Sequence, residues 1–481
     1  MDRRAGTFVS GVRGDRRVKI AVVGGGIAGL AIAYRLCATH DVTLFERDPA
    51  PGGKINSQHL DGYLFEWGPN GFLSNAEALS ALIDEIGLGP ELVEASPAAA
   101  KRSIWWNGKL HALPAKPQQA LSMSIVSPGA KLGALRELFT GPYVQTDPDR
   151  DESVYAFAAR RLGPEFAERL ISPALLGISG GDARETSLDA LFPRMRAMER
   201  EHGSLIRAAL ASKRRPGRLT NFGASGMARP IARLAELLGA RLRTGANVLA
   251  VRPGGDGWEL DVETDGARER FTCDRAVFAI PAYDAADLLG PLDAALDAEL
   301  RAIPYVPMRV VGLAFRPGDV PAPLDGFGFL VARNFGVRIL GALYTSTIFP
   351  MQAPPGTAYL RVFLGGALDR EAAGLDAESA RAVVRADLRA TLGITAEPIV
   401  YHEYVWPRAI AQYRLDHRAR VRRIEARLGS LPGLEVAGNA FRGLGLGDNV
   451  RDALALAERL NGAGAPPRGT PAATGTVATE R

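Results

Sequence analysis

The fold can be inferred from residues 18–29, VKIAVVGGGIAG, and from the segments that follow them. Val18 to Val23 is a short apolar run that stops at glycines, which is typical of a buried parallel strand. The apolar spacing from Ile27 to Thr39 predicts an amphipathic helix, and Val42 to Glu46 predicts a second buried strand. Together these segments form one strand–helix–strand unit of the usual size.

The glycines between the first strand and the helix form a G-x-G-x-x-G element. Gly24 permits a tight turn, Gly26 lets a pyrophosphate approach the backbone, and Gly29 allows close packing of the helix on the strand. Glu46 ends the second strand, where a carboxylate accepts ribose hydroxyl groups, and a glutamate there disfavours a 2′-phosphate and therefore NADP. The start of the helix contributes two further positions to this dinucleotide site, Ile27 and Ala28.

A second glycine-rich segment, ERDPAPGGK at residues 46–54, follows the second strand directly. Its glycine pair offers main-chain amides and space beside a diphosphate or ribityl chain. The segment resembles the E-R-to-G-G-[RK] motif of the flavoprotein superfamily that includes monoamine oxidase and the carotene desaturases. The resemblance implies that the dinucleotide is FAD and that Arg47, Gly53 and Lys54 contact it.

A third glycine-rich turn lies near the C-terminus. Residues 434–438 predict a strand, and NAFRGLGLGD at 439–448 leads into a helix from about Val450, whose N-terminus can face ribityl or flavin oxygens. The turn resembles the terminal flavin motif of the same superfamily, although residues 447–449 read Gly-Asp-Asn where relatives often have Asn-Asp-Cys. The implied cofactor contacts in this turn are Asn439, Leu444, Gly445 and Leu446.

Between these motifs the character of the chain changes twice. Asn107-Gly108 lies between strand-like runs and predicts a hairpin over residues 101–113 with a type I′ turn. From Pro117 to about Gly217 helical spacing replaces strand alternation, which predicts a helical insert. Strand-like runs then follow at 241–251, 258–263, 276–280, 308–315, 327–331, 338–344 and 358–364.

We therefore expect an α/β chain with a Rossmann-like FAD-binding domain, discontinuous in sequence, an α+β substrate domain and an all-helical insert domain. The expected FAD-binding domain comprises residues 18–98, 219–282 and 418–462. The expected substrate-binding domain comprises residues 99–116 and 283–417, and the insert comprises residues 117–218. Residues 1–17 and 463–481 are expected to be disordered tails.

Further motifs resemble the oxygen-dependent protoporphyrinogen oxidases, especially the bacterial type. They are FEWGPNGF at 65–72, LHALP at 110–114, MEREH at 198–202, GFGFLV at 326–331, LGG at 364–366 and QY at 412–413. The similarity runs in one order through roughly residues 18 to 462. It implies oxidation of protoporphyrinogen IX to protoporphyrin IX in haem biosynthesis, using FAD and O₂ and releasing hydrogen peroxide. Coproporphyrinogen III oxidation to coproporphyrin III stays open as an alternative, as does another amine oxidase or desaturase activity of the superfamily.

The same resemblance implies a set of site residues. Arg102 would hold a propionate of the macrocycle in bidentate fashion, a role that Lys101 could share. Asn70 would lie in the turn between flavin and substrate. The implied apolar walls and ring contacts are Leu330, Leu343, Phe363 and Gly328. Asn70 is also an implied cofactor contact, together with Gly68, Pro69 and Val248.

No catalytic acid or base is predicted. Transfer of a hydride to flavin N5 depends on alignment and on exclusion of water more than on a strong protein base. Gly177-x-Ser179-x-Gly181 also matches the nucleophile elbow of α/β-hydrolases, but that motif needs a preceding strand, and residues 169–176 have a helical pattern.

The composition narrows the function further. The net charge of +5 is small for 481 residues, so we expect a carboxylated small-molecule partner and no nucleic acid. The two cysteines and six histidines show no spacing typical of a metal site, and none is predicted. No apolar run is long enough to cross a membrane, and a cytoplasmic location is expected.

The segment Pro117–Ala130 is uncharged and leaves two alternatives open. Its apolar side chains could lie on the inner face of the cell membrane as a peripheral contact, or they could pack against the insert. These side chains are Leu121, Met123, Ile125 and Val126. The sequence does not decide the oligomeric state, and a homodimer is compatible with it.

Overall fold

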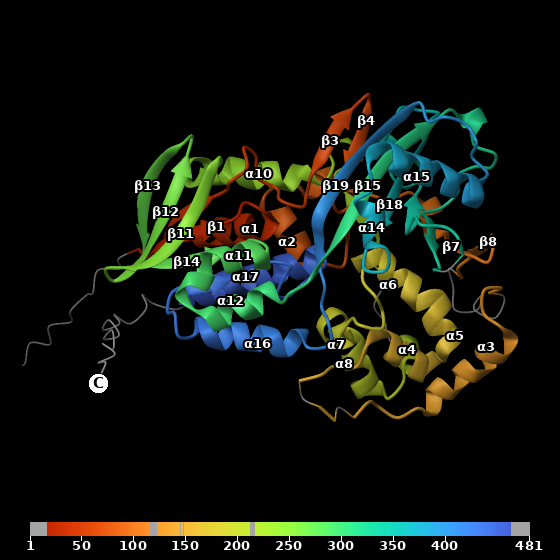
Figure 1. The fold of residues 1–481 in the computed structure, drawn as a ribbon, viewed down its shortest axis with the longest axis horizontal. Coiled ribbons are helices and arrows are strands. Elements are labelled where there is room, and N and C mark those ends of the chain that lie inside the picture. The colour runs from red at the N-terminus through yellow and green to blue at the C-terminus, as the bar shows by residue number, and fades with distance from the viewer. Residues whose placement is uncertain are drawn as a thin grey trace, which may run out of the picture.

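The computed structural model describes residues 17–462 apart from 115–122, 145, 148, 212–216 and 334. Figure 1 shows three parts. An α/β layer contains both ends of the described chain, a large curved sheet lies beside it, and a group of helices lies below that sheet. Apart from Arg17, the predicted tails lie outside the described residues, as do residues 117–122 of the segment that could touch a membrane.

A five-stranded parallel sheet forms the centre of the α/β layer, in the order β10-β2-β1-β14-β20. Its strands are β1 (Lys19–Val23), β2 (Asp41–Phe45), β10 (Leu242–Arg243), β14 (Arg275–Phe278) and β20 (Leu434–Val436). The first two confirm the strands expected from the opening motif. Both faces of such a sheet must be covered, which explains its nearly continuous apolar runs.

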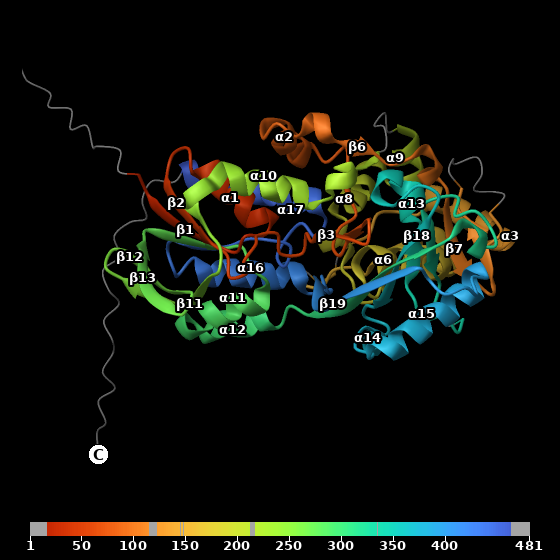
Figure 2. The ribbon, with the colours of Figure 1, turned by 90° about the horizontal axis from the view of Figure 1, so that it is seen from above.

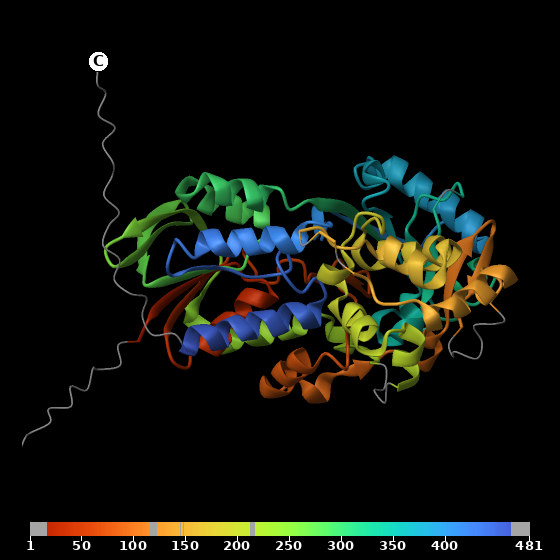
Figure 3. The same cartoon turned by 90° about the horizontal axis from the view of Figure 1, so that it is seen from below.

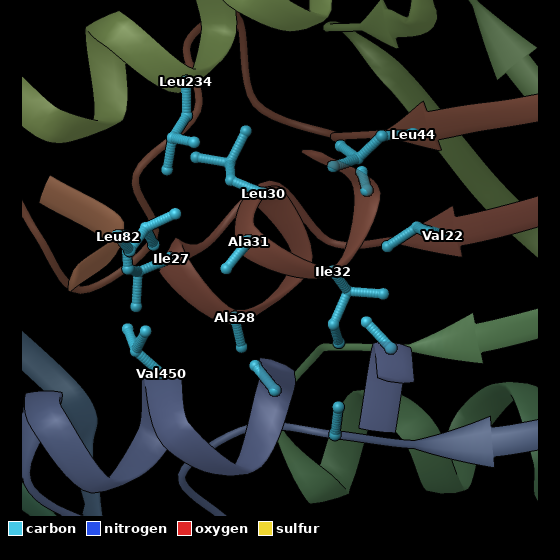
Figure 4. Packing of buried hydrophobic residues seen from close by; sticks show 14 of the residues in the cluster. Val22, Ile27, Ala28, Leu30, Ala31, Ile32, Leu44, Leu82, Leu234 and Val450 are labelled. Carbon is cyan, nitrogen blue, oxygen red and sulfur yellow. The ribbon is translucent and has the colours of Figure 1, made fainter. Parts of the chain in front are cut away.

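One face of this sheet carries four helices that share one apolar core with it. They are α1 (Ile27–Leu36), α2 (Glu77–Glu85), α10 (Ala228–Leu238) and α17 (Leu446–Gly462). Figure 4 shows Ile27 and Ala28 of α1 close to Val450 of α17, with Leu82 of α2 beside them. The helices that begin at the first and third glycine-rich turns therefore pack directly on each other.

The other face is covered by a three-stranded antiparallel sheet and three helices, as Figures 2 and 3 show from above and below. The strands are β11 (Ala246–Gly254), β12 (Gly257–Thr264) and β13 (Ala267–Cys273). The helices are α11 (Ala282–Leu289), α12 (Ala294–Arg301) and α16 (His417–Leu428). Because α11 and α12 pack in this core, the chain enters the large sheet at Tyr305, later than the expected boundary after residue 282.

The large sheet has seven strands in the order β19-β15-β18-β17-β16-β7-β8. They are β7 (Arg102–Trp106), β8 (Lys109–Ala112), β15 (Tyr305–Phe315), β16 (Gly328–Val331), β17 (Gly341–Leu343), β18 (Ala358–Gly365) and β19 (Val400–Ala411). Neighbouring strands are antiparallel except β16 and β7, which are parallel. Helices α14 (Arg370–Ala373) and α15 (Ala377–Leu392) cover one face.

The predicted hairpin is confirmed, since β7 and β8 meet at Asn107 and Gly108 with φ of 48° and 77°. The prediction of a strand over 338–344 was too long, because β17 covers only three of these residues. The short elements around the two domains are β3 (Ser57–Leu60), β4 (Tyr63–Glu66), β5 (Phe72–Leu73), β6 (Val93–Glu94), β9 (Leu219–Asn221) and α13 (Thr345–Ile348).

The predicted helical insert is confirmed in residues 123–211 that the structure describes. Its elements are α3 (Pro128–Ala134), η4 (Leu135–Phe139), α4 (Val154–Leu162), α5 (Pro164–Phe166), η5 (Ala167–Ile171), α6 (Ser172–Ser179), α7 (Leu188–Leu191), α8 (Pro193–His202) and α9 (Leu205–Ala211). A buried ion pair links two of these helices, with Arg161 Nε donating to Glu199 at 2.9 Å. Ser179 ends α6, with helix instead of strand before it, so the hydrolase motif lacks its required geometry.

Candidate flavin and substrate site

The first glycine turn has the geometry of a nucleotide cradle. Gly24 has a φ of 106°, which favours glycine, and a Cβ on Gly29 would lie 1.9 Å from the Gly24 carbonyl oxygen. Among the described residues, no atom outside the local backbone lies within 4 Å of the place where a Gly26 Cβ would be. The turn is thus closed towards the protein and open at the position where the sequence predicts a pyrophosphate.

Glu46 lies at the end of β2 beside this turn. One carboxylate oxygen accepts from Gly25 N at 2.6 Å, and the other accepts from Asp48 N at 2.8 Å. Burial raises the pKa of Glu46, and the two backbone hydrogen bonds oppose that rise. Each oxygen keeps a free lone pair, so the carboxylate is held in one orientation and can still accept ribose hydroxyls.

The second glycine-rich segment packs on the first. Gly52 N donates to Gly25 O at 2.9 Å, and a Gly53 Cβ would lie 3.6 Å from Gly26 Cα. A Cβ on Gly68 would lie 1.8 Å from Lys54 O, so only glycine fits where these two segments meet. Residues 52–54 and Gly68 therefore share one small region beside the open Gly26.

The charged side chains of this segment already have protein partners. Lys54 Nζ donates to Arg408 O at 2.8 Å and lies 4.4 Å from the centre of the Trp406 ring. Burial lowers the pKa of Lys54 to about 8. Arg47 pairs with Asp284 at 3.3 Å and is largely exposed. The sequence did not predict these partners of Lys54 and Arg47.

Two side chains, one on α16 and one just before it, bind backbone carbonyls of the third glycine-rich turn. Tyr413 donates from its hydroxyl to Asn439 O at 2.8 Å, and His417 Nε2 lies 3.0 Å from Phe441 O. Leu446 begins α17, earlier than the expected start near Val450. In the part of the chain that the structure describes, no atom beyond the neighbouring residues lies within 4 Å of the place where a Gly438 Cβ would be.

Val248 lies 7% exposed on β11, in the same apolar cluster as Phe45, which precedes Glu46 in the chain. The strand's start is tied to Glu46, since Ala246 N donates to Glu46 O at 2.8 Å. The acid, the three glycine-rich turns and this strand thus converge at one edge of the parallel sheet. Their open glycines, oriented carboxylate and helix N-termini fit a flavin dinucleotide.

The predicted substrate residues lie along two cross-strand rows of the large sheet. The first row joins Arg102 of β7, Gly328 of β16, Leu343 of β17 and Arg361 of β18, each opposite the next. In the second row, two residues further along each strand, Leu330 and Phe363 both lie opposite Gly341 of β17. Because side chains two residues apart share a face, Leu343, Leu330 and Phe363 form one apolar surface.

Helix α6 of the insert lies against this surface. A Cβ on Gly177 would lie 2.3 Å from Cδ2 of Leu330, so a larger residue there would displace the Leu330 side chain. Ile178 next to it is 62% exposed. The insert thus approaches this surface at Leu330 through Gly177 of α6, a contact that sequence reasoning missed.

Gly328 has a structural reason for being glycine. Its φ is 129°, and a Cβ would lie 2.0 Å from Ala342 O of the neighbouring strand. Strand packing thus accounts for this glycine, and contact with a substrate ring is not needed to explain it.

The two cations at the start of β7 differ. Lys101 forms an ion pair with Asp325. Arg102 is exposed and lies 5.0 Å from the centre of the Phe327 ring, and none of the described residues forms an ion pair with it. Of these two cations, Arg102 is therefore the one whose side chain is free to bind a carboxylate.

Asn70 is bound to a residue that the sequence analysis did not select. Arg361 Nη1 donates to Asn70 Oδ1 at 2.9 Å, and Arg361 Nη2 donates to Gly68 O at 2.9 Å. Pro69 lies between these two acceptors. The signal was in the sequence, because an arginine interrupts the apolar strand AYLRVFLG.

The uncharged segment after the hairpin is partly described. Met123, Ile125 and Val126 are buried with Ile104 and Ala332, so these three side chains pack inside the protein. Leu121 lies outside the described residues. In the part of the chain that the structure covers, no helix has the length and apolar character of a membrane span. Among the described residues, the Asp, Glu, Cys and His side chains form no group of three that could hold a metal ion.

Comparison with known proteins places the chain among flavoenzymes. The family model for flavin-containing amine oxidoreductases matches residues 27–461. The chain is 31% identical to protoporphyrinogen oxidase 1 of Spinacia oleracea over 90% of its own length and 82% of the relative's. It is 28% identical to coproporphyrinogen III oxidase of Bacillus subtilis, with 91% and 96% covered. A crystal structure of a candidate protoporphyrinogen oxidase from Exiguobacterium sp. 255-15 has a TM-score of 0.78 at 27% identity, covering 92% of this chain and 98% of that one.

Proposed function

Because the chain belongs to the flavin-containing amine oxidoreductases, together with the protoporphyrinogen oxidases, we propose that it oxidises protoporphyrinogen IX to protoporphyrin IX. It is an FAD-dependent oxidoreductase. In the proposed reaction O₂ takes up the electrons, hydrogen peroxide is released, and the product enters haem biosynthesis.

The observation that carries this proposal is the arrangement of Arg102 and the apolar surface. A flat, apolar macrocycle with peripheral carboxylates needs a broad apolar wall and a cation at its edge. Leu330, Leu343 and Phe363 supply the wall, and Arg102 lies at one end of it without an acid partner among the described residues.

The protein's part in this reaction is binding and alignment. Bound flavin would supply the two-electron acceptor. Arg102 would hold a carboxylate, the apolar wall would exclude water from the reacting carbon, and Asn70 would lie between the two ligands. Residues of the three glycine-rich turns would hold the FAD, namely Gly24, Gly26, Ile27, Ala28, Gly29, Glu46, Arg47, Gly53, Lys54, Asn439, Leu444, Gly445 and Leu446. The turn after β4 would add Gly68, Pro69 and Asn70, and β11 would add Val248.

Coproporphyrinogen III oxidation to coproporphyrin III is the second candidate, supported by the 28% identity to the Bacillus subtilis protein. Coproporphyrinogen has four propionates where protoporphyrinogen IX has two, so it calls for more cations around the slot. Lys101 is already paired with Asp325, which leaves Arg102 as the free cation at the start of β7. This difference favours the substrate with fewer carboxylates.

A direct assay tests the proposal. Purified protein should show flavin absorbance, and under air it should generate porphyrin fluorescence faster from protoporphyrinogen IX than from coproporphyrinogen III. The two substrates should be compared side by side at matched concentrations. A colourless protein that takes up no FAD would refute the proposal, and faster turnover of coproporphyrinogen III would establish the second candidate.

We also propose peripheral contact with an acidic lipid surface. An exposed apolar patch on α3 and η4 supports it, formed by Leu132, Leu135 and Phe139, which are 70%, 52% and 88% exposed. Arg136 lies within the patch, and a basic residue between apolar ones suits an interface with anionic headgroups. A cytoplasmic location and a homodimer are compatible with this proposal.

A further inference from the structure

Arg361 lies at the middle of β18 and is only 1% exposed. Its two terminal nitrogens donate to Asn70 Oδ1 and to Gly68 O. Its Nε has no hydrogen-bond partner in the described structure and is out of reach of water. Its hydrogen-bond partners among the described residues therefore all belong to the turn at residues 68–70, and the guanidinium also lies 5.3 Å from the centre of the Phe363 ring.

The positive charge of Arg361 has no carboxylate bound to it among the described residues. Glu66 is the acid that acts on it through space, but the Glu66 oxygens accept from Ser57 Oγ at 2.6 Å and Met227 N at 2.7 Å. Burial lowers the pKa of Arg361, yet a guanidinium stays charged in proteins. An unpaired charge in the interior is costly, and a nearby electron-rich group would offset that cost.

The bond to Arg361 also fixes the direction of the Asn70 amide. If the amide were rotated by half a turn, its NH₂ group would face the guanidinium, donor against donor. Asn70 therefore presents its oxygen to Arg361 and keeps Nδ2 as a donor. Nδ2 has no partner among the described residues, so it is left for an acceptor on a ligand.

The sheet places Arg361 and Arg102 at opposite ends of one row. Three strand-to-strand steps separate them, from β7 through β16 and β17 to β18. At about 4.8 Å a step the separation is about 14 Å. Arg102 is exposed at one end, and Arg361 is buried at the other, against the turn that joins the glycine-rich cofactor region at Gly68.

We propose that Arg361 is a positioning residue that holds the Asn70 amide as a hydrogen-bond donor and keeps a fixed positive charge at the flavin end of the slot. This inference rests on the proposed FAD site. A fixed cation beside a flavin stabilises the negative charge gained on reduction and raises the midpoint potential. The slot would thus have a carboxylate end at Arg102 and an electron-accepting end at Arg361.

Substitution of Arg361 tests the inference. Arg361→Gln should lower the flavin midpoint potential and reduce kcat about 10- to 100-fold, because a small misplacement at the reacting centre costs about that much. KM should change less than about threefold, since the carboxylate contact is remote. Arg361→Lys should restore the potential but only part of kcat, because lysine keeps the charge without the two-pronged geometry.

Two further variants separate this role from folding. Arg309→Gln is the matched control, since Arg309 is also buried, on adjacent β15, but faces the opposite side of the sheet and pairs with Glu403. It should lower the melting temperature and leave the flavin potential unchanged. Asn70→Asp supplies the missing carboxylate at nearly constant shape, so it should lower kcat and the potential without lowering the melting temperature.

The outcomes are distinct. Equal flavin potentials in wild type and Arg361→Gln, or full turnover in Asn70→Asp, would overturn the inference while FAD binding stands. A wild type that binds FAD without oxidising a porphyrinogen would refute the proposed function, and the potentials would still decide the role of Arg361. A wild type without bound flavin would overturn both.

Discussion

At the residue scale, two arginines on one face of a sheet have different partners and therefore different expected roles. Arg102 is exposed with a free guanidinium, whereas Arg361 is buried and bound to Asn70 and Gly68. An exposed cation binds a ligand group that arrives from solvent, and a buried one acts on groups already in place. Substitutions should separate these roles as effects on KM and on kcat.

Arg102→Ala should raise KM for the porphyrinogen about 10- to 100-fold and change kcat little. A hydrogen-bonded contact between charged groups contributes about 1.5–3 kcal/mol, and this contact is remote from the reacting carbon. Steady-state fluorescence assays over a range of substrate concentrations measure both constants. Lys101→Ala is the control and should change KM less than about threefold, because Lys101 is paired with Asp325. An unchanged KM in Arg102→Ala would show that another cation holds the carboxylate.

At the element scale, α16 holds the third glycine-rich turn through a buried histidine. His417 is 3% exposed, stacks on the Tyr413 ring at 4.0 Å, and lies within hydrogen-bond distance of Phe441 O. Burial lowers the pKa of His417 to about 4. The neutral imidazole can donate from Nε2 to that carbonyl, so α16 and the turn are joined by a group that titrates in acid.

The stability of the protein should therefore fall between about pH 6.5 and pH 4. In this range the unfolded chain binds a proton at His417 and the folded protein does not, so the unfolded state gains stability as the pH falls. The loss from this group is about 2 kcal/mol at pH 5 relative to neutral pH. Urea unfolding of the flavin-free protein at a series of pH values measures it.

His417→Phe should be less stable at neutral pH by about 1 kcal/mol, because the Phe441 carbonyl loses its donor. It should also show a shallower decline in acid. His59→Phe, at an exposed histidine on β3, should keep the wild-type pH dependence. Parallel pH profiles for wild type and His417→Phe would assign the acid sensitivity to other groups.

At the scale of the whole molecule, the insert approaches the large sheet with helix α6 and has its exposed apolar patch on other elements. Gly177 of α6 lies against Leu330 of the proposed substrate wall, and Leu132, Leu135 and Phe139 lie on α3 and η4. Figure 1 places α3 at the outer end of the insert, away from the α/β layer. A lipid surface could therefore be contacted without covering the nucleotide region.

Leu132→Ser with Phe139→Ser should lower binding to vesicles that contain anionic lipid several-fold, because two large apolar side chains leave the interface. Co-sedimentation with vesicles at low and moderate salt measures the effect. Leu237→Ser, at an exposed position on α10, is the control and should bind as wild type does. Equal binding of the double variant and the wild type would remove the patch as the contact.

The sequence alone determined the elements that depend only on interactions between residues close together in the chain. The strand, glycine turn and helix at residues 19–36, the Asn107-Gly108 hairpin and the helical character of the insert follow from short-range rules of glycine conformation and apolar spacing. The flavin family followed too, because its motifs are contiguous strings. The boundary after residue 282 was placed too early, since only packing shows that α11 and α12 belong to the α/β core.

Tertiary structure decided which residues meet across the sheet. Arg361 and Asn70 are far apart in the chain, and their contact depends on the register of β18 and on the position of the turn after β4. Arg102 likewise has no acid partner among the described residues because the nearby Asp325 pairs with Lys101. Strand register and loop position result from the cooperative packing of distant segments, so no local pattern specifies these partners.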